Sequence, residues 1–161
     1  MASDLTSGAY AGKKTVLYYD SAETWATPTW AEIARARNVQ TTEGPALTEV
    51  EFHGTGKTTS ITGYDSFSGS FEYVRKSGTD AVYAYLAAAR AAGDTIHLAH
   101  LNGPVDETGP TGWKAPVVLG EFSETANGND SVVVTIPFAL ADAYDGSNVQ
   151  IGKTALAGSA A

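Results

Sequence analysis

The segment Ser66–Val74 constrains the fold most, because its side chains alternate with a period of two. One face carries Phe67, Gly69, Phe71 and Tyr73, and the other carries Ser66, Ser68, Ser70 and Glu72. Such alternation is typical of a β-strand that lays one face on a hydrophobic core. The chain must therefore build a sheet that covers this apolar face.

Further strands are predicted on both sides of this segment. They are Lys14–Asp20, Ile33–Thr41, Ala46–Phe52, Thr95–Leu101, Trp113–Phe122 and Ser131–Leu140. In the last of them the apolar residues at every second position face one way, while Pro137 predicts an edge or a strand end, since proline cannot donate to the ladder. Between the last two strands, the Asn-Gly pair within residues 124–130 predicts a hairpin. Trp25 and Trp30 predict a loop over Ser21–Ala31 that folds onto the body.

One helix is predicted, over Thr79–Ala92. Its inward stripe at helical spacing consists of Val82, Tyr83 and Leu86, followed by Ala89 or Arg90. Thr79 is the expected N-cap and Gly93 the expected left-handed C-cap. The element order predicts a mainly β fold, a β-sandwich or barrel with one flanking α-helix.

The segment Thr42–Gly63 is predicted to form a long hairpin with too little apolar surface to be stable alone. Within it, Glu49 and Glu51 lie on one strand face, about 7 Å apart from the strand rise. A polar, glycine-containing turn follows at Gly54–Thr59. The hairpin therefore requires contacts from outside itself.

The sequence offers little support for catalytic or ligand chemistry. Gly54–Thr59 resembles a phosphate-binding loop, but the position that needs the first glycine is Glu51, and no helix is predicted to follow. His97 and His100 lie three apart on a strand, so they face opposite sides, and His53 is isolated. Glu49 with Glu51 could act as a carboxylate pair, but a solvated strand face is the favoured interpretation, since no neighbouring segment indicates a pocket. We therefore expect no catalytic residue, metal or cofactor.

Composition limits the classes of protein to which the chain can belong. The chain has 161 residues, 43% of them hydrophobic, which fits one domain. Its formal net charge is −8 with ten Lys and Arg, so tight binding to a phosphate backbone is not expected. It has no cysteine, and no apolar run is long enough for a membrane helix. We expect a flexible arm at residues 1–12, a β-domain at 13–154 and a flexible tail at 155–161.

Several segments together resemble the tail tube (major tail) proteins of long-tailed bacteriophages. The resemblance covers roughly residues 16–138 and rests on the order and spacing of its parts. These are Trp30–Gln40, the hairpin tip at Gly54–Lys57, Tyr64–Val74, the helix-to-strand stretch Asp80–His100, Gly109–Trp113, and Val117–Glu124 before a valine-rich last strand.

This resemblance implies a non-enzymatic subunit that forms hexameric rings stacked into a virion tail tube, a conduit for DNA ejection. It implies self-contacts, tail terminator, tape measure and baseplate partners, passage of DNA without specific binding, no membrane, and assembly in the host cytoplasm. The hairpin would reach the neighbouring ring, through Glu43, Glu49, Glu51, His53, Gly54, Gly56, Lys57 and Thr58. An acidic lumen would be lined by Glu49, Glu51 and Glu72. The flanking helix would pack through Val82, Tyr83, Leu86 and Arg90.

Two alternatives stay open. The chain could be another ring or shell component of a phage or injection machine: a tail terminator, a secretion-system tube or a capsid decoration protein. It could also be a carbohydrate-binding or hydrolytic β-sandwich that uses Trp25, Trp30 and Trp113 with Glu49 and Glu51.

Overall fold

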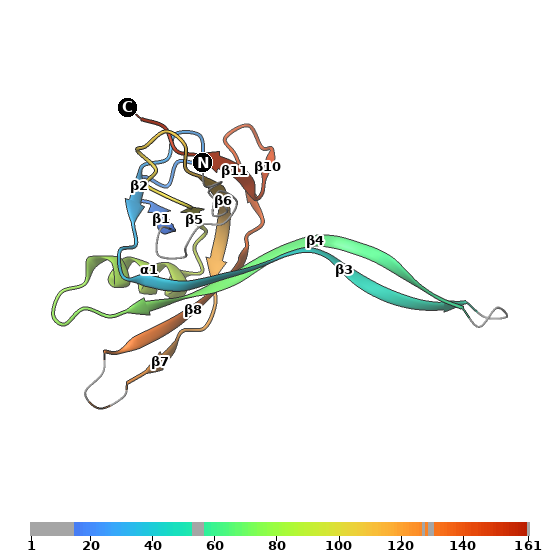
Figure 1. The fold of residues 1–161 in the computed structure, drawn as a ribbon, viewed down its shortest axis with the longest axis horizontal. Helices are drawn as coiled ribbons and strands as arrows, with labels where there is room; N and C mark the ends of the chain where they lie inside the picture. Colours follow the sequence, from blue (N-terminus) through green and yellow to red (C-terminus); the bar gives the residue numbers. More distant parts are fainter. Residues whose placement is uncertain (1–14, 53–56, 127, 129–130, 161) are drawn as a thin grey trace, which may run out of the picture.

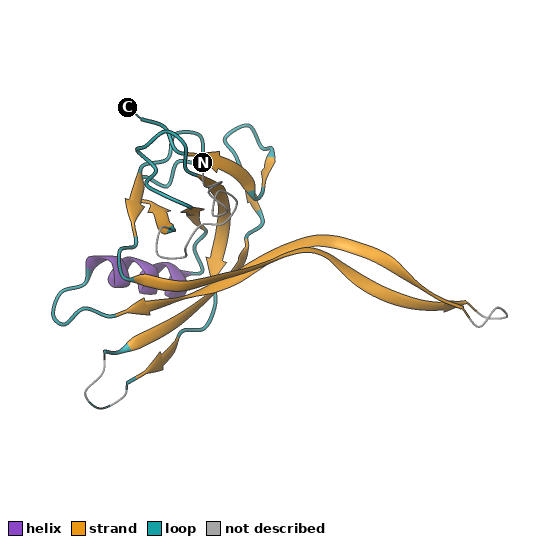
Figure 2. Cartoon of the chain, in the orientation of Figure 1, coloured by secondary structure: helices purple, strands orange, loops and turns teal. Residues whose placement is uncertain are grey.

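The computed structural model describes residues 15–52, 57–126, 128 and 131–160. Across these residues it consists of a β-rich body, one helix and a two-stranded arm that projects far from the body (Figures 1 and 2). The elements are β1 (Val16–Asp20), β2 (Trp30–Glu32), β3 (Ala36–Phe52), β4 (Lys57–Val74), α1 (Ala81–Ala92), β5 (Ile96–Leu101), β6 (Thr111–Leu119), β7 (Ser123–Thr125), β8 (Val133–Leu140), β9 (Ala143–Tyr144), β10 (Gln150–Ile151) and β11 (Thr154–Ala157).

One antiparallel sheet makes up most of the body. Its strand order is β2-β1-β5-β6-β8-β4-β3, with β11 paired to β6 and β7 paired to β8, while β9 and β10 form a separate hairpin. β2 and β3 lie at the two ends of this order, yet only residues 33–35 connect them in the chain. Since three residues span little more than 10 Å, the sheet must curl back on itself. The predicted mainly β fold with one flanking helix is confirmed.

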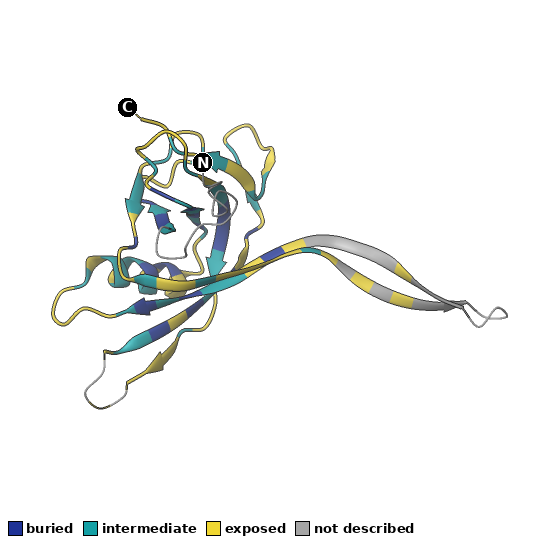
Figure 3. Ribbon diagram, in the orientation of Figure 1, coloured by how far each residue is buried: buried dark blue, intermediate teal, exposed yellow. Residues whose placement is uncertain are grey.

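The core lies inside this curled sheet. Phe71, Leu86, Ile96, Leu98, Ala115, Val117, Val134 and Ile136 have 0–1% of their surface exposed. The predicted inward face of Ser66–Val74 is confirmed, because Phe67, Phe71 and Tyr73 are buried. Figure 3 shows the buried residues concentrated in the body and at the root of the arm.

Helix α1 lies against the sheet and contributes Leu86 and Ala89 to the core. The predicted cap at Thr79 is wrong by one residue, because the side chain of Asp80 accepts the hydrogen bond from the backbone N–H of Tyr83. The predicted C-cap is confirmed, since Gly93 has φ 71° and donates to the last carbonyls of the helix.

The two strands of the hairpin are longer than the sequence predicts. β3 joins the predicted strands Ile33–Thr41 and Ala46–Phe52 into one, and β4 runs unbroken from the arm into the body. β3 continues through residues 42–45, which separate the two predicted strands, and its pairing with β4 shifts register between Arg37 and Gln40 and between Pro45 and Leu47. At the first shift, Asn38 has φ 50°, which asparagine tolerates better than most residues.

Other boundaries also differ from the prediction. Trp30 lies in the short strand β2 and not in a loop, and the predicted strand Trp113–Phe122 ends at Leu119. Pro137 lies inside β8, at the point where the partner on one side changes from β7 to β6. The carbonyl of Pro137 accepts a hydrogen bond from the backbone N–H of Gly120 there, which links the end of β6 to β8.

The C-terminal segment differs from the expected flexible tail. Residues 154–157 form β11, which pairs with β6 through Leu156 opposite Gly112. The expected N-terminal arm lies outside the described residues. None of the helical segments among the described residues has the length and hydropathy that a bilayer crossing requires.

Candidate assembly surfaces

The arm projects from the body as a two-stranded ribbon (Figure 1). Beyond its root, β3 and β4 pair with each other only, from Leu47 opposite Thr62 to Phe52 opposite Lys57. Leu47 is 69% exposed and Glu49 is also exposed. A two-stranded ribbon without a covering layer gains little from apolar burial. Between residues 47 and 62, the ladder therefore joins β3 and β4 to each other and to no further described strand.

The predicted hairpin residues fall along this arm. Glu49, Glu51, Lys57 and Thr58 lie in its strands, with Glu51 opposite Thr58 in the ladder. Glu43 lies at the root of the arm. His53, Gly54 and Gly56 lie outside the described residues.

The root of the arm is fixed by contacts from the C-terminal segment. The ammonium of Lys153 forms an ion pair with the carboxylate of Glu43 and lies 5.5 Å from the centre of the Phe67 ring. Next to Glu43, Gly44 has φ 133°, a conformation that favours glycine. The ladder shifts register just beyond it, between Pro45 and Leu47. A cavity of about 230 Å³ lies at this point, lined by Gly44, Phe67, Leu140 and the ion pair.

The three acidic residues predicted to share a surface are not brought together. Glu49 and Glu51 lie on the arm, whereas Glu72 lies in the body on β4. The carboxylate of Glu72 accepts from the guanidinium of Arg37 at 2.9 Å and from the amide of Asn38 at 2.7 Å. Its charge is therefore already balanced by Arg37 within the subunit.

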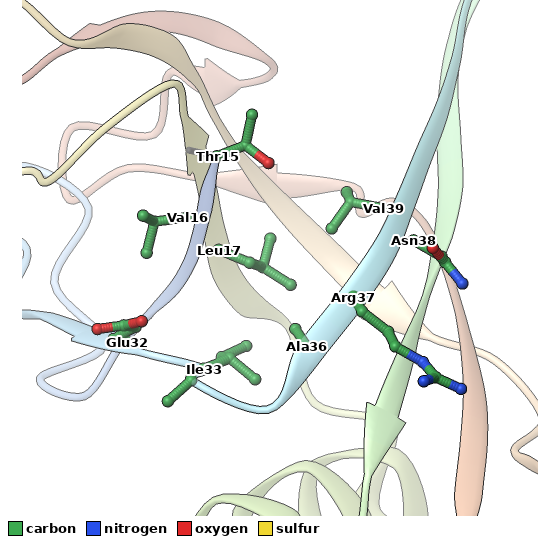
Figure 4. A pocket seen from close by; sticks show the side chains of 10 residues that line it. Thr15, Val16, Leu17, Glu32, Ile33, Ala36, Arg37, Asn38 and Val39 are labelled. Carbon is green, nitrogen blue, oxygen red and sulfur yellow. The ribbon is translucent and has the colours of Figure 1, made fainter. Parts of the chain in front are cut away.

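The curled sheet leaves an open seam where its two ends approach. A cavity of about 610 Å³ lies between β1 and β3, lined by residues 15–17, 32–34 and 36–39. Figure 4 shows the side chains of Leu17, Ile33 and Val39 directed into the space between the strands, while Arg37 and Asn38 lie on the outer side of β3. The seam therefore has an apolar interior and a polar rim.

A buried carboxylate organises the loop that follows β1. Asp20 is 1% exposed and accepts from the backbone N–H groups of Ala22 (3.0 Å), Thr24 (2.6 Å) and Thr29 (2.8 Å). The Nδ1 atom of His97 lies 3.2 Å from its second oxygen. Burial raises the pKa of Asp20, but these hydrogen bonds outweigh burial and hold the pKa below its ordinary value.

The three tryptophans predicted as a glycan platform are partly buried against the body. Trp25 lies edge-on to His97, with the Lys114 ammonium 4.3 Å from its ring centre. Trp113 packs against Phe67 and beside His100, and Trp30 packs on the smaller apolar cluster of the body. Since the two predicted acids lie on the arm, aromatic rings and carboxylates do not form one site.

The two described histidines, His97 and His100, are partly buried in the body. His97 pairs with Asp20, and the Nε2 atom of His100 is buried without a hydrogen-bond partner. Burial lowers the pKa of His100, which favours the neutral ring. Among the described residues, no group of three or more His, Asp or Glu side chains could hold a metal ion.

The predicted helix stripe packs as expected at three of its four positions. Leu86 is fully buried, and Val82 and Tyr83 are partly buried against the core. Arg90 is exposed instead, with its guanidinium 4.8 Å from the centre of the Phe122 ring. The guanidinium is held by this cation–π contact. Its positive charge lies in the last turn of α1, where it interacts favourably with the helix dipole.

Solved structures share this architecture. A chain in the tail of an empty gene transfer agent particle, determined with C6 symmetry, has a TM-score of 0.59 at 17% identity, over 84% of this chain and 96% of that one. The SPP1 tail tube has a TM-score of 0.66 at 16% identity, over 92% of this chain and 79% of that one. The chain has a tail-tube fold.

A tube from a contractile system has the same fold. A chain of the sheath-tube complex of an extracellular contractile injection system, PVC, has a TM-score of 0.59 at 10% identity, over 92% of this chain and 91% of that one. No protein-family model and no curated protein sequence matches the chain. The tail-tube fold is thus supported by structure at identities where sequence alone gives no match.

Three features of these surfaces were not predicted. The Asp20 turn had a local signal, because an aspartate that ends an apolar strand before Ser, Glu and Thr is typical of a side-chain-stabilised turn. The pair of Lys153 with Glu43 joins residues 110 apart, so no local pattern could indicate it. The cavity at the seam depends on how the sheet curls, which is also non-local.

Proposed function

We propose that this chain is a structural subunit that self-assembles into stacked hexameric rings and so forms a phage tail tube. The observation that carries the proposal is the exposed arm on a body with the tail-tube fold. An arm with 69% of Leu47 exposed and no covering layer needs a second copy to bury it. Head-to-tail contacts between copies extend without limit once rings stack.

The role is non-catalytic. The carboxylates and histidines that could do chemistry are dispersed: Glu49 lies on the arm, Glu72 is paired with Arg37, and His97 is paired with Asp20. We infer that the protein needs no cofactor and acts through its shape and its contacts.

The tube would contact a terminator at one end and baseplate and tape measure proteins at the other. Its place would be the virion tail, after assembly in the host cytoplasm, and DNA would pass through it without specific binding. The net charge of −8 supports this, because an acidic wall repels a phosphate backbone. Glu49 and Glu51 are the candidates for an inter-ring or lumen surface.

A tube of an injection machine is the second candidate. It is favoured by the PVC sheath-tube complex, whose chain matches 92% of this one. The two candidates differ in what surrounds the tube, because the tube of that complex lies within a sheath-tube assembly. Co-purification of the tube with a sheath protein would favour the second candidate.

Electron microscopy of the purified protein tests the proposal directly. We expect hollow tubes with a regular axial repeat across a range of protein concentrations. Deletion of residues 50–61 should leave a folded body, with an unchanged melting temperature, that forms no tubes. Normal tubes from this deletion would contradict the role of the arm, and an absence of tubes or rings from the intact chain, alone and with tail initiator proteins, would contradict the proposed function.

A further inference from the structure

A cleft rich in cations lies at the end of the body where β4 meets α1. It has a volume of about 400 Å³ and is lined by Arg35, Arg75, Lys76, Ser77, Ser131 and Val132, which we call the basic cleft. All three cationic side chains are exposed. Three of the ten Lys and Arg residues of an acidic chain thus gather around one hollow.

Two of these cations lie outside the ion pairs formed among the described residues. Arg75 donates to Glu124 at 2.9 Å, but Arg35 and Lys76 form no ion pair with any described residue. The nearby carboxylate of Asp80 accepts hydrogen bonds from the hydroxyl of Tyr73 and from the backbone N–H groups of Lys76 and Tyr83. Burial raises the pKa of Asp80, but these hydrogen bonds and the positive charge of Arg35 hold it below its ordinary value, so Arg35 acts on this carboxylate without forming an ion pair with it. The positive end of the α1 dipole lies beside the same cleft.

An unpaired acidic loop lies at the opposite end of the body. Residues 104–109 lie within the connection between β5 and β6, which spans residues 102–110, far from the end of β4 (Figure 1). Asp106 and Glu107 are exposed at its tip, and neither side chain forms an ion pair or a hydrogen bond with a described residue. We call residues 104–109 the acidic loop.

The acidic loop is held in one conformation. The backbone N–H of Val105 donates to the Tyr18 hydroxyl at 3.1 Å, and that of Ser159 donates to the Val105 carbonyl at 2.9 Å. A side chain at Gly158 would collide with the Glu107 carbonyl, at 2.4 Å. A loop fixed from both sides loses little conformational entropy when a partner binds.

We propose that the basic cleft of one subunit receives the acidic loop of a second copy. Opposite charges at opposite ends of one body produce a head-to-tail contact, which repeats from copy to copy. The contact brings the unpaired Arg35 and Lys76 beside the unpaired Asp106 and Glu107. This inference rests on the proposed function, since it names a surface through which tube subunits meet.

A charge swap tests the contact. Lys76→Glu and Glu107→Lys should each raise the protein concentration needed for assembly about tenfold, because each places like charges together. The double variant, which keeps the net charge at −8, should restore assembly. Asp94→Lys changes the net charge as Glu107→Lys does, at an exposed site elsewhere, and should not weaken assembly. Thermal melts check that each variant folds.

Cysteine pairing gives an independent readout, because the chain has no cysteine. Mixing Lys76→Cys subunits with Asp106→Cys subunits should give mixed disulfide dimers in clear excess over mixtures with Asp94→Cys. Mixed dimers without tubes would support the contact while the tube function fails. If the protein forms tubes, but mixed dimers show no excess and the charge swap has no effect on assembly, the contact is overturned while the tube function stands.

A nucleic acid is the other occupant that the cleft could attract. Fluorescence anisotropy with a short labelled DNA duplex distinguishes a nucleic acid from the acidic loop of a second copy as the occupant of the basic cleft. If wild-type protein binds the duplex and Lys76→Glu abolishes that binding while self-association is unchanged, the proposal is overturned. If Lys76→Glu leaves binding to the duplex unchanged but abolishes self-association, the proposal is supported.

Discussion

The body and the arm use the same two strands in opposite ways. Near Phe71, β4 is covered by a core in which side chains are fully buried, whereas along the arm Leu47 on β3 remains 69% exposed. The ladder of hydrogen bonds continues through both regions. The contacts described along the arm are therefore those of backbone pairing, whereas apolar burial stabilises the body. Changes in the body should affect folding, and changes in the arm should affect assembly.

The largest effect is expected in the body. Phe71→Ala removes a fully buried ring that touches Phe138, and should lower the free energy of unfolding by about 3–5 kcal/mol. Urea unfolding followed by circular dichroism measures this loss. A loss below about 1 kcal/mol would show that Phe71 does not belong to the core that supports the body.

The Asp20 turn should give the next largest effect. Asp20→Ala leaves three backbone N–H groups without their acceptor in a buried site, and should cost about 2–4 kcal/mol. Asp20→Asn keeps one acceptor oxygen and should cost less. Equal stability of the alanine variant and the wild type would contradict the structural role of this carboxylate.

The same carboxylate makes stability depend on pH. Because its pKa is lower in the folded protein than in the unfolded chain, its contribution is present above the ordinary aspartate range and is lost as the pH falls through the lowered folded pKa. Asp80, whose pKa is also lowered, acts in the same direction. We expect the difference in stability between wild type and Asp20→Asn to shrink as the pH falls from 6 toward 2, as measured by thermal melts.

A small effect is expected where body and arm meet. Lys153→Met removes the ion pair with Glu43 but keeps an aliphatic chain over Phe67, and should cost less than about 1 kcal/mol, as exposed pairs do. Faster amide exchange at residues 43–47, with unchanged exchange in β5, would locate the loss at the arm root. An equal increase throughout the body would contradict this boundary.

The smallest effect on folding is expected in the arm. Leu47→Ser should change the free energy of unfolding by less than about 0.5 kcal/mol, because the side chain is already in water. Assembly followed by light scattering should nevertheless weaken. Val149→Ser, at a 59% exposed position of the body, is the matched control and should weaken assembly less.

Local patterns predicted the parts of the fold that depend on neighbouring residues. The alternation around Phe71 gave the correct buried face, and Gly93 gave the correct end of α1, because both signals come from the chain within a few residues. The merging of two predicted strands into β3 was missed, since Pro45 normally interrupts a strand. In the structure Pro45 lies at a register shift, which accommodates it.

The candidate surfaces were predicted only in part. The arm was anticipated because residues 42–63 lack apolar surface, a property of composition. The separation of Glu72 from Glu49 could not be anticipated, because it depends on how far β4 extends from the body. The basic cleft gathers residues from three separate segments, 35, 75–77 and 131–132, and so had no local signal.

The long antiparallel ladder of the arm has a mechanical consequence. Its hydrogen bonds lie across the strands, so a force along the arm loads many of them in shear at the same time. A force that separates the strands at one end loads them one after another. An arm that is bound by a partner along its length would therefore resist tension. The same two-stranded ribbon would still bend sideways, because it is only one layer thick. Such an element can hold neighbouring units together in a filament that must flex without breaking.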